Sequence, residues 1–327
     1  MPNPKVFITR VIPDKGLEII KNFCDVDVWS DELPPSREKL LQHVRGIDGL
    51  LSLLTDKIDE EVINVAGPQL RVISNFAVGF DNIDIPAATA RKIPVGNTPD
   101  VLTDVTADFA FALMMSVARR IPEAERYVHE GKWKTWGPKT LLGVDLKGAT
   151  LGLIGFGRIG KAVARRAAGF DMRVIYYDPT ETDIHSDIKA MKVNFEMLLE
   201  EADFISLHTP LTDETRHLID AKALAQMKPT AVLINTSRGP VVDSFALYEA
   251  LKVNRIFGAG LDVTEPEPLP SDSPLLTLDN LVITPHIASA SITARDNMSW
   301  MATQNLIAGL KGERLPNCVN PQVYSEK

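Results

Sequence analysis

Short apolar runs rich in β-branched residues alternate with amphipathic segments over the first hundred residues of the chain. Apolar runs of about four to eight residues predict strands, whereas apolar positions spaced three and four apart predict helices. Strands that alternate with helices favour a parallel sheet covered by helices on both faces. The pattern predicts strands at residues 6–9, 26–29, 49–54, 70–75 and 93–96, and helices at residues 13–23, 37–44 and 59–66.

A long helical segment follows at residues 106–119, and it is apolar on almost every side. A helix of that kind must be buried on every side. The core of one chain could bury it, or part of it could lie in a contact between two copies, and the sequence leaves both interpretations open. The next segment contains Trp133 and Trp136, and it would belong to the same contact because tryptophan is enriched in interface cores.

A second series of alternating strands and helices runs from Thr150 to about Pro285, and residues 291–310 again have a long helical pattern. The chain contains no internal repeat and no low-complexity run. Because 327 residues exceed the size at which one hydrophobic core keeps growing, two domains are expected. The expected fold class is therefore α/β, with two doubly wound parallel sheets.

The formal net charge of −8 disfavours a nucleic-acid partner, because affinity for phosphate backbones depends on clustered Lys and Arg. No apolar stretch reaches the length that spans a membrane, so no membrane partner is expected. The two cysteines, Cys24 and Cys318, form no CxxC motif, and no HExxH occurs, so neither a disulfide framework nor a metal site is indicated. These features favour a cytoplasmic protein that meets an anionic substrate with individual arginines or backbone N–H groups.

A glycine-rich segment gives the most specific local motif. Residues 150–154 read as a buried strand that leads through Gly155, Gly157 and Gly160 into a helix. In a dinucleotide-binding loop the first glycine permits a tight turn, the second lets the backbone approach a pyrophosphate, and the third lets helix and strand pack closely. Asp178 ends the next predicted strand, 178 − 160 = 18 residues after the last glycine, where an acidic residue contacts the ribose of NAD.

Three chemically distinctive residues follow later strands of the second series. Arg238 lies after the strand at residues 231–235, Glu267 after residues 258–261, and His286 after residues 281–284. Ligands of open parallel sheets bind beyond the carboxyl ends of the strands, so these side chains can converge on one site. Each residue alone is more often structural than catalytic, but their joint placement beyond a dinucleotide-binding motif favours function.

At these residues the chain resembles the D-isomer-specific 2-hydroxyacid dehydrogenase family, and within it the glyoxylate/hydroxypyruvate reductase branch, over nearly its whole length. Several motifs in the family's order carry the resemblance, at residues 77–84, 106–108, 155–160, 235–239, 260–268 and 284–290. The resemblance implies a flavodoxin-like substrate-binding domain of residues 1–101 and 290–327 and a Rossmann NAD-binding domain of residues 102–289. It also implies an active site in the cleft between these domains, and a homodimer.

The activity that the resemblance implies is NAD(P)H-dependent reduction of a small 2-oxo acid, glyoxylate or hydroxypyruvate, to the D-2-hydroxy acid. The implied catalytic residues are Arg238, Glu267 and His286. His286 suits the role of proton donor because imidazole titrates near neutrality, and Glu267 would stabilise its imidazolium form. Arg238 offers a planar fork that can hold the substrate carboxylate and polarise the oxo group.

The resemblance extends to the binding residues. The cofactor-binding residues that it implies are Thr106, Gly155, Phe156, Gly157, Arg158, Ile159, Gly160, Asp178, Thr209, Pro210, Thr215, Thr236, Ser237, Arg238, Asp262, His286 and Ala288. The implied substrate-binding residues are Leu54, Ala77, Val78, Gly79, Arg238 and His286, together with Trp136 of the partner subunit. NAD(H) is expected to be preferred over NADP(H), because residues 179–183 after Asp178 supply acids and no Arg or Lys.

Related activities differ at single positions. Phosphite dehydrogenases resemble this chain but have a lysine where Val78 stands, and formate dehydrogenases have a glutamine where Glu267 stands, which argues against both. A 3-phosphoglycerate or other D-2-hydroxyacid dehydrogenase stays open, as does a non-enzymatic NADH-sensing corepressor. One departure from the family pattern is Ala288, where the motif after the histidine usually has glycine. It leaves the size of the pocket an open question.

Overall fold

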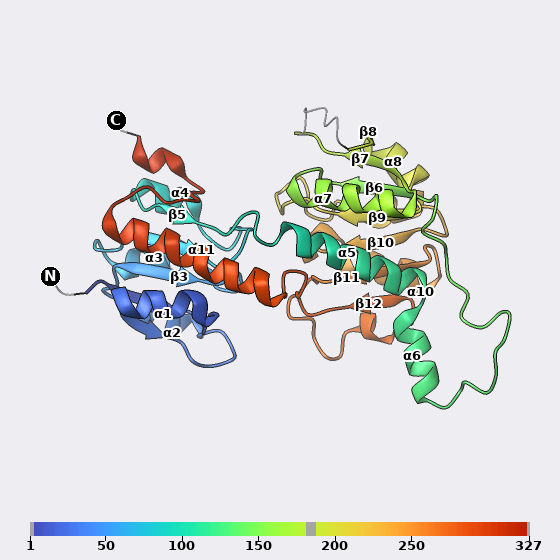
Figure 1. The fold of residues 1–327 in the computed structure, drawn as a ribbon, viewed down its shortest axis with the longest axis horizontal. Coiled ribbons are helices and arrows are strands. Elements are labelled where there is room, and N and C mark those ends of the chain that lie inside the picture. The colour runs from blue at the N-terminus through green and yellow to red at the C-terminus, as the bar shows by residue number, and fades with distance from the viewer. Residues whose placement is uncertain (1–2, 181–187, 326–327) are drawn as a thin grey trace. The chain divides into compact units, whose positions relative to one another are not determined.

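The computed structural model describes residues 3–180 and 188–325 and divides into two compact units, shown in Figure 1. The first unit contains residues 1–102 and 290–327, and the second contains residues 103–289. Both ends of the chain therefore contribute to the first unit. The predicted α/β class with two parallel sheets is confirmed, because each unit contains one sheet whose strands all run parallel.

The first unit contains a five-stranded sheet in the order β2-β1-β3-β4-β5, the strand order of the flavodoxin-like fold. Its strands are β1 (Lys5–Ile8), β2 (Asp25–Val28), β3 (Gly49–Ser52), β4 (Val72–Asn75) and β5 (Val95–Gly96). Its helices are α1 (Asp14–Phe23), α2 (Arg37–His43), α3 (Glu60–Ala66), α4 (Ile85–Ala90) and α11 (Ile292–Lys311), with a short 3-10 helix, η4 (Pro321–Tyr324).

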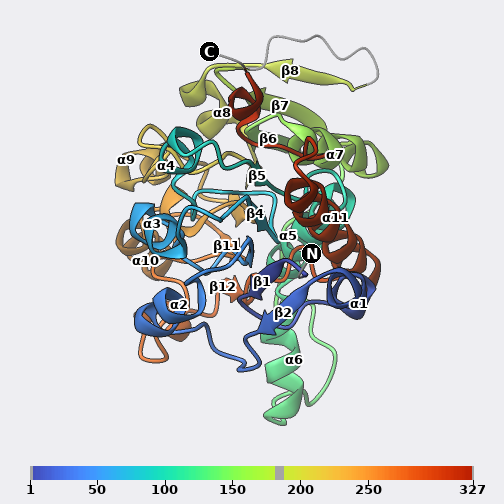
Figure 2. The ribbon, with the colours of Figure 1, turned by 90° about the vertical axis from the view of Figure 1, so that its left-hand side faces the viewer.

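Helices cover both faces of this sheet. Figure 2 shows α1 and α11 on one face and α2, α3 and α4 on the other. The strands β3 and β4 are buried at every position, as expected for a parallel sheet that has no solvated face. Phe7, Leu50, Ile73 and Val95 belong to the core beneath α2, α3 and α4.

The second unit contains a seven-stranded sheet in the order β12-β11-β10-β9-β6-β7-β8. Strands β6 to β11 have the spatial order of the Rossmann fold, and β12 is one further strand at the edge. Its strands are β6 (Thr150–Ile154), β7 (Arg173–Tyr177), β8 (Ala190–Lys192), β9 (Phe204–Leu207), β10 (Val232–Asn235), β11 (Gly258–Leu261) and β12 (Leu281–Ile283). Its helices are α5 (Thr103–Ala118), α6 (Ile121–His129), α7 (Arg158–Ala167), η1 (Ala168–Phe170), α8 (Phe195–Glu201), α9 (Ala221–Gln226), η2 (Gly239–Val241), α10 (Ser244–Lys252) and η3 (Pro274–Thr277).

Two hydrophobic clusters flank this second sheet. One lies beneath α5 and α7 and the other beneath α8, α9 and α10. Seven of the α-helices begin after a residue whose side chain accepts a backbone N–H of the first turn, which satisfies a donor that the helix itself cannot. These N-terminal caps are Ser36, Asp59, Asp84, Asn194, Asp220, Asp243 and Ser291.

The core of one chain does not bury the whole of the helix expected at residues 106–119, and the alternative of a contact between two copies is untested. The helix α5 buries Ala107, Ala110 and Met114 against the sheet, but Ala112 is exposed and Phe109 is only partly buried. Its outer side is therefore not covered by its own unit. The sequence pattern also missed the strand β8, which is only three residues long and includes Lys192.

A long segment without helix or strand, residues 130–149, follows α6 and returns to β6 (Figure 1). It presents Trp133 and Trp136 to solvent, with 64% and 81% of their surfaces exposed. Across residues 3–180 and 188–325, no helix is long and apolar enough to cross a membrane, and no cluster of His, Cys, Asp or Glu could hold a metal ion. Cys24 and Cys318 are both free thiols.

Candidate active site

The three loops that carry Arg238, Glu267 and His286 begin at one edge of the second sheet. Asn235 at the end of β10 pairs with Leu261 at the end of β11, and Leu261 pairs with Ile283 at the end of β12. Because the strands are parallel and in this register, the following loops must leave the sheet side by side. This is the crevice edge at which ligands of open α/β sheets bind.

Glu267 and His286 are in direct contact. The imidazole Nδ1 of His286 lies 2.6 Å from Oε1 of Glu267, and the two side chains are 24% and 33% exposed. The carboxylate fixes the ring orientation and occupies Nδ1, so Nε2 is the atom that can exchange a proton with a substrate. His286 has a left-handed backbone, with φ of 55°, which a non-glycine residue adopts rarely and mainly where function requires it.

The pKa of Glu267 lies below the usual range of a glutamate. Burial is the largest single cause and raises this pKa, but the hydrogen bond and charge of His286, the backbone N–H of Thr264 and the charge of Arg238 together lower it by more. The side chain is therefore ionised at neutral pH, and Arg238 is close enough to contribute. The ionised carboxylate can then accept a hydrogen bond from the imidazole Nδ1–H and orient the ring.

Asp262 organises the loop that carries His286. This carboxylate is 1% exposed. Its Oδ1 accepts hydrogen bonds from the Thr284 hydroxyl at 2.6 Å and the Ile287 N–H at 2.8 Å, and Oδ2 accepts the Ala288 N–H at 2.7 Å. The sequence assigned Asp262 and Ala288 to the cofactor. The structure shows in addition that Asp262 holds both sides of the His286 backbone.

Arg238 follows β10 in a loop that Asn235 shapes. The buried Asn235 donates through Nδ2 to the Arg238 carbonyl at 2.8 Å and accepts from the N–H and hydroxyl of Ser237. The next residue, Gly239, has no room for a side chain, because a Cβ there would lie 1.9 Å from the Thr264 carbonyl oxygen. The Arg238 loop and the Glu267 loop are therefore packed backbone to backbone. The sequence places Asn235 only in the motif at residues 235–239. Only the fold shows that its side chain shapes the Arg238 loop.

The buried hydroxyl of Thr236 is a candidate for a contact with the cofactor. Among the side chains of residues 3–180 and 188–325, its Oγ1 is one of few buried polar atoms without a hydrogen-bond partner. An unsatisfied buried hydroxyl costs about 1–3 kcal/mol, so such atoms usually face a ligand or an ordered water. The position of Thr236, at the carboxyl end of a central strand, fits the expected nicotinamide dinucleotide.

The glycine loop after β6 has the geometry that phosphate binding requires. Gly155 has φ of 91°, and a Cβ there would lie 2.6 Å from the His208 backbone. A Cβ on Gly160 would lie 2.3 Å from the Gly155 carbonyl oxygen, whereas a Cβ on Gly157 would meet nothing within 4 Å. Gly157 therefore borders open space at the N-terminus of α7, where backbone N–H groups and the helix dipole favour an anion. Arg158 and Ile159 form the first turn of this helix.

Asp178 lies beside this loop, directly after β7. Its Oδ2 accepts the Phe156 N–H at 2.8 Å, and Oδ1 accepts the N–H and hydroxyl of Thr180, both at 2.8 Å. The carboxylate is therefore fixed at the carboxyl end of the strand next to the glycine loop. Of the segment 179–183 that was expected to supply acids here, Glu181, Thr182 and Asp183 lie outside the described part of the chain.

The loop after β9 contains His208, Thr209 and Pro210. Thr215 braces it, since its hydroxyl donates to the Pro210 carbonyl at 2.7 Å and accepts the N–H of Thr212 at 2.8 Å. His208 was not among the residues expected from the sequence. Burial lowers its pKa to about 3, so the ring is neutral, and Nε2 lies 2.9 Å from the Ser206 hydroxyl.

In the first unit, the loop after β4 presents Val78 and Gly79. Asn75 donates to the Gly79 carbonyl at 2.9 Å, and Asn97 donates to the Val78 carbonyl at 2.8 Å. The backbone N–H groups of Val78 and Gly79 have no acceptor among the described residues. Two adjacent N–H groups held in this way can bind a carboxylate oxygen.

The remaining expected residues differ in exposure. Ala77 is buried before Val78, and Leu54 is partly exposed in the turn after β3. Thr106 is 3% exposed in the first turns of α5. Trp136 is largely uncovered, with 81% of its surface open to solvent.

Comparisons with known proteins identify close relatives. The sequence profile described as "D-isomer specific 2-hydroxyacid dehydrogenase, NAD binding domain" matches residues 111–288. A glyoxylate reductase of Korarchaeum cryptofilum is 55% identical over 322 residues, which cover 98% of this chain and 97% of the relative.

Solved structures agree with these sequence relatives. The TT0316 protein of Thermus thermophilus is 47% identical, with a TM-score of 0.91 over 96% of this chain and 99% of that one. The NADPH-dependent glyoxylate/hydroxypyruvate reductase SmGhrB of Sinorhizobium meliloti, in complex with NADP and malonate, is 32% identical, with a TM-score of 0.86 over 99% of each chain.

Proposed function

Because this chain belongs to the D-isomer-specific 2-hydroxyacid dehydrogenase family, we propose that it reduces glyoxylate or hydroxypyruvate to the D-2-hydroxy acid, with His286 as the proton donor. It is an NAD(P)-dependent oxidoreductase, as its glyoxylate reductase relatives are. The observation that carries the assignment of roles is the 2.6 Å contact between His286 Nδ1 and Glu267 Oε1. Reduction of a 2-oxo acid consumes one hydride and one proton, and yields the hydroxy acid and the oxidised cofactor.

The bound nicotinamide supplies the hydride to the carbonyl carbon. The imidazolium of His286 donates a proton from Nε2 to the carbonyl oxygen as negative charge develops there. Glu267 holds the ring by Nδ1 and so orients Nε2 for the transfer. Arg238 donates hydrogen bonds to the substrate carboxylate and polarises the oxo group.

The substrate carboxylate also needs ligands from the first unit. The N–H groups of Val78 and Gly79 support this role, since they lack acceptors within the described chain. Ala77 precedes them, and Leu54 provides apolar contact to the rest of the substrate. In this proposal residues 1–101 and 290–327 form the substrate-binding domain, and residues 102–289 form the cofactor-binding domain.

We assign the dinucleotide to the glycine loop of the second unit. Gly155, Phe156, Gly157, Arg158, Ile159 and Gly160 bind the pyrophosphate, with Thr106, Thr209, Pro210, Thr215, Thr236, Ser237, Asp262 and Ala288 along the rest of the cofactor. Asp178 selects NADH over NADPH, because its carboxylate accepts hydrogen bonds from the ribose hydroxyls and repels a 2′-phosphate. Its fixed position beside the Phe156 N–H supports this role.

We further propose a cytoplasmic homodimer. The uncovered side of α5, with Phe109 and Ala112, and the exposed Trp133 and Trp136 supply the apolar surface that a second copy would bury. In this arrangement Trp136 of the partner subunit closes the substrate pocket. Trp136→Ala then loosens discrimination against bulky 2-oxo acids, and light scattering of the parent shows a dimer. An active monomer with unchanged selectivity in the variant contradicts this part of the proposal.

The activity is tested by NADH and NADPH oxidation with a panel of 2-oxo acids. Glyoxylate and hydroxypyruvate should be reduced with the highest kcat/KM, and 3-phosphohydroxypyruvate should be a poor substrate. A preference for the phosphorylated acid would instead assign a 3-phosphoglycerate dehydrogenase. Binding of NADH without turnover of any 2-oxo acid would favour the non-enzymatic sensor.

A further inference from the structure

We propose that Asn82 is a positioning residue that locks together the two substrate-facing loops of the first unit, and so sets the affinity for the 2-oxo acid. The loops are the turn at residues 53–56, which presents Leu54, and the loop at residues 76–82, which presents Val78 and Gly79. The inference rests on the proposed function, because those residues are substrate ligands only in that proposal. It adds a residue that does not itself touch the substrate.

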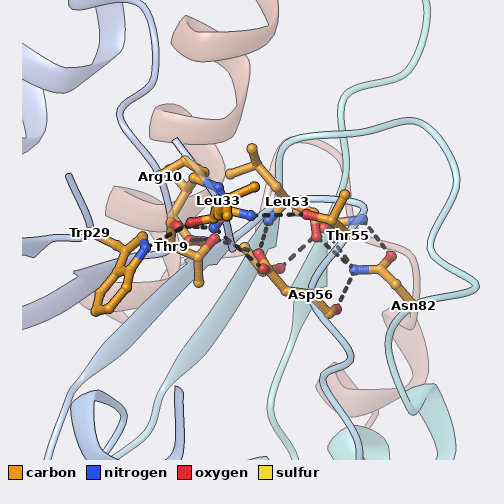
Figure 3. Close-up of polar contacts among 11 residues, drawn as sticks. Thr9, Arg10, Trp29, Leu33, Leu53, Thr55, Asp56 and Asn82 are labelled. Carbon is orange, nitrogen blue, oxygen red and sulfur yellow. Dashed lines mark hydrogen bonds and ion pairs between the residues drawn. The ribbon is translucent and has the colours of Figure 1, made fainter. Parts of the chain in front are cut away.

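The side chain of Asn82 binds the backbone of the first of these loops. Its Nδ2 donates to the carbonyl oxygens of Leu53 and Asp56, both at 3.0 Å, as Figure 3 shows. These are the two ends of the turn, and the Asp56 N–H closes it with a 3.1 Å bond to the same Leu53 carbonyl. Leu54 lies between these fixed ends, so its backbone cannot shift while both bonds are in place.

The same side chain is linked to the second loop. Asn82 Oδ1 accepts from the Asn75 Nδ2 at 3.1 Å, and that Nδ2 also donates to the Gly79 carbonyl at 2.9 Å. Asn75 is completely buried at the end of β4, and its Oδ1 accepts the Ser52 hydroxyl at the end of β3. One amide pair therefore connects the Leu54 turn, the Gly79 peptide and the ends of two central strands.

The buried side chain of Asp56 holds the Leu54 turn through further hydrogen bonds. Asp56 is 4% exposed, and its Oδ2 accepts the Leu53 N–H at 2.7 Å and the Thr9 hydroxyl at 2.5 Å. Arg10 lies 3.7 Å from Oδ1 and donates to the Thr55 hydroxyl at 3.3 Å (Figure 3). Because Asp56 fixes the turn to β1, Asn82 is the element that fixes it relative to the Val78–Gly79 peptide.

This arrangement matters for binding rather than for proton transfer. Asn82 belongs to the first unit, whereas Arg238, Glu267 and His286 belong to the second. Loss of its N–H donors frees the turn relative to the carboxylate-binding peptide, so the substrate must order both loops when it binds. Such a cost applies equally to the ground state and the transition state, and it raises KM while kcat stays constant.

The test variant is Asn82→Asp, which keeps the shape of the side chain and replaces the donor by a carboxylate oxygen facing two carbonyls. We expect KM for glyoxylate and hydroxypyruvate to rise about tenfold or more, because about one to two hydrogen bonds are lost. We expect kcat to change less than about twofold and the Kd for NADH to stay constant. If this variant does not fold, Asn82→Ser is the second variant, and its KM must rise as well.

The matched control is Asn320→Asp. Asn320 is a buried asparagine of the same unit, whereas Asn82 is partly buried, and Asn320 donates to Thr89 Oγ1 and the Ile93 carbonyl and accepts the Val95 N–H. It should lower Tm and leave KM unchanged. An unchanged KM in the folded Asn82 variants, or an equal rise in the control, overturns the inference. A parent that reduces no 2-oxo acid overturns the proposed function, whereas an active parent with insensitive Asn82 variants overturns only this inference.

Discussion

The Oδ2 atom of Asp262 accepts a 2.7 Å hydrogen bond from the backbone N–H of Ala288. Since Oδ1 accepts the Ile287 N–H as well, the carboxylate fixes the backbone that follows His286. Asp262→Asn replaces one acceptor by a donor and leaves a buried N–H unsatisfied, which costs about 1–3 kcal/mol. We expect urea unfolding to show that loss and kcat to fall, because His286 is released. A stable variant with parental kcat would show that the loop holds its shape without Asp262.

Ala288 itself fits this loop without strain. Its φ is not in the left-handed region, and its N–H donates to Asp262, so the loop accommodates the Ala288 methyl group. The residue is 7% exposed.

Two glycines of the phosphate loop make a matched pair. A methyl group at Gly157 meets nothing within 4 Å, whereas a methyl group at Gly160 would lie 2.3 Å from the Gly155 carbonyl oxygen. Gly157→Ala should therefore fold normally and weaken NADH binding, because the methyl group occupies the approach of the pyrophosphate. Gly160→Ala should lower Tm. Calorimetric Kd values and thermal unfolding separate the two effects, and normal NADH affinity in Gly157→Ala would move the pyrophosphate elsewhere.

Cofactor selectivity depends on Asp178 in this account. With NADPH, a 2′-phosphate and this carboxylate would meet within a few ångströms, at a cost between about 1 and about 4 kcal/mol depending on the local dielectric. The parent should thus prefer NADH by about fivefold to a thousandfold in kcat/KM. Asp178→Ser should narrow that preference, with kcat/KM measured for both cofactors. A parent that prefers NADPH, or a variant with no gain in NADPH use, would exclude Asp178 as the selector.

The pH dependence of stability should reveal His208. Burial lowers its pKa in the folded protein to about 3, whereas an unfolded histidine titrates near about 6.5. Between these values the unfolded chain binds the extra proton, so stability rises with pH through this window and is lost as pH falls. His208→Gln should reduce the slope by up to about 1.4 kcal/mol per pH unit. Urea unfolding from about pH 4 to about pH 7 measures it, with exposed His129→Gln as the control. Equal slopes in parent and His208→Gln would contradict the burial of a neutral ring.

Much of the fold could be predicted from the chain itself, because parallel strands buried on both faces read as short continuous apolar runs. The glycine loop could also be predicted, because three glycines at fixed spacing between a strand and a helix have few alternative explanations. The strand β8 was missed, since an edge strand of three residues with Lys192 and an exposed Met191 has no apolar period to detect.

The candidate active site could be predicted only in part from the sequence. Residues that touch reactants have distinctive chemistry, whereas Asn75, Asn82 and Asn235 act through hydrogen bonds to backbone carbonyls. Nothing in a sequence reports which carbonyl an asparagine will reach, because this depends on how separate loops meet at the sheet edge. His208 was missed for another reason, since only the folded chain shows the surroundings that lower the pKa of its ring.

The most direct measurement is steady-state NADH oxidation by the parent and by His286→Ala, with glyoxylate and with hydroxypyruvate. The account predicts an active parent and a kcat lower by about 10²–10⁴-fold in the variant, because a positioned acid acts only as charge develops in the transition state. The Kd for NADH should stay within about twofold of the parent value. A parent inactive toward both acids, or a variant in which only KM changes, would contradict the assignment of His286 as the proton donor.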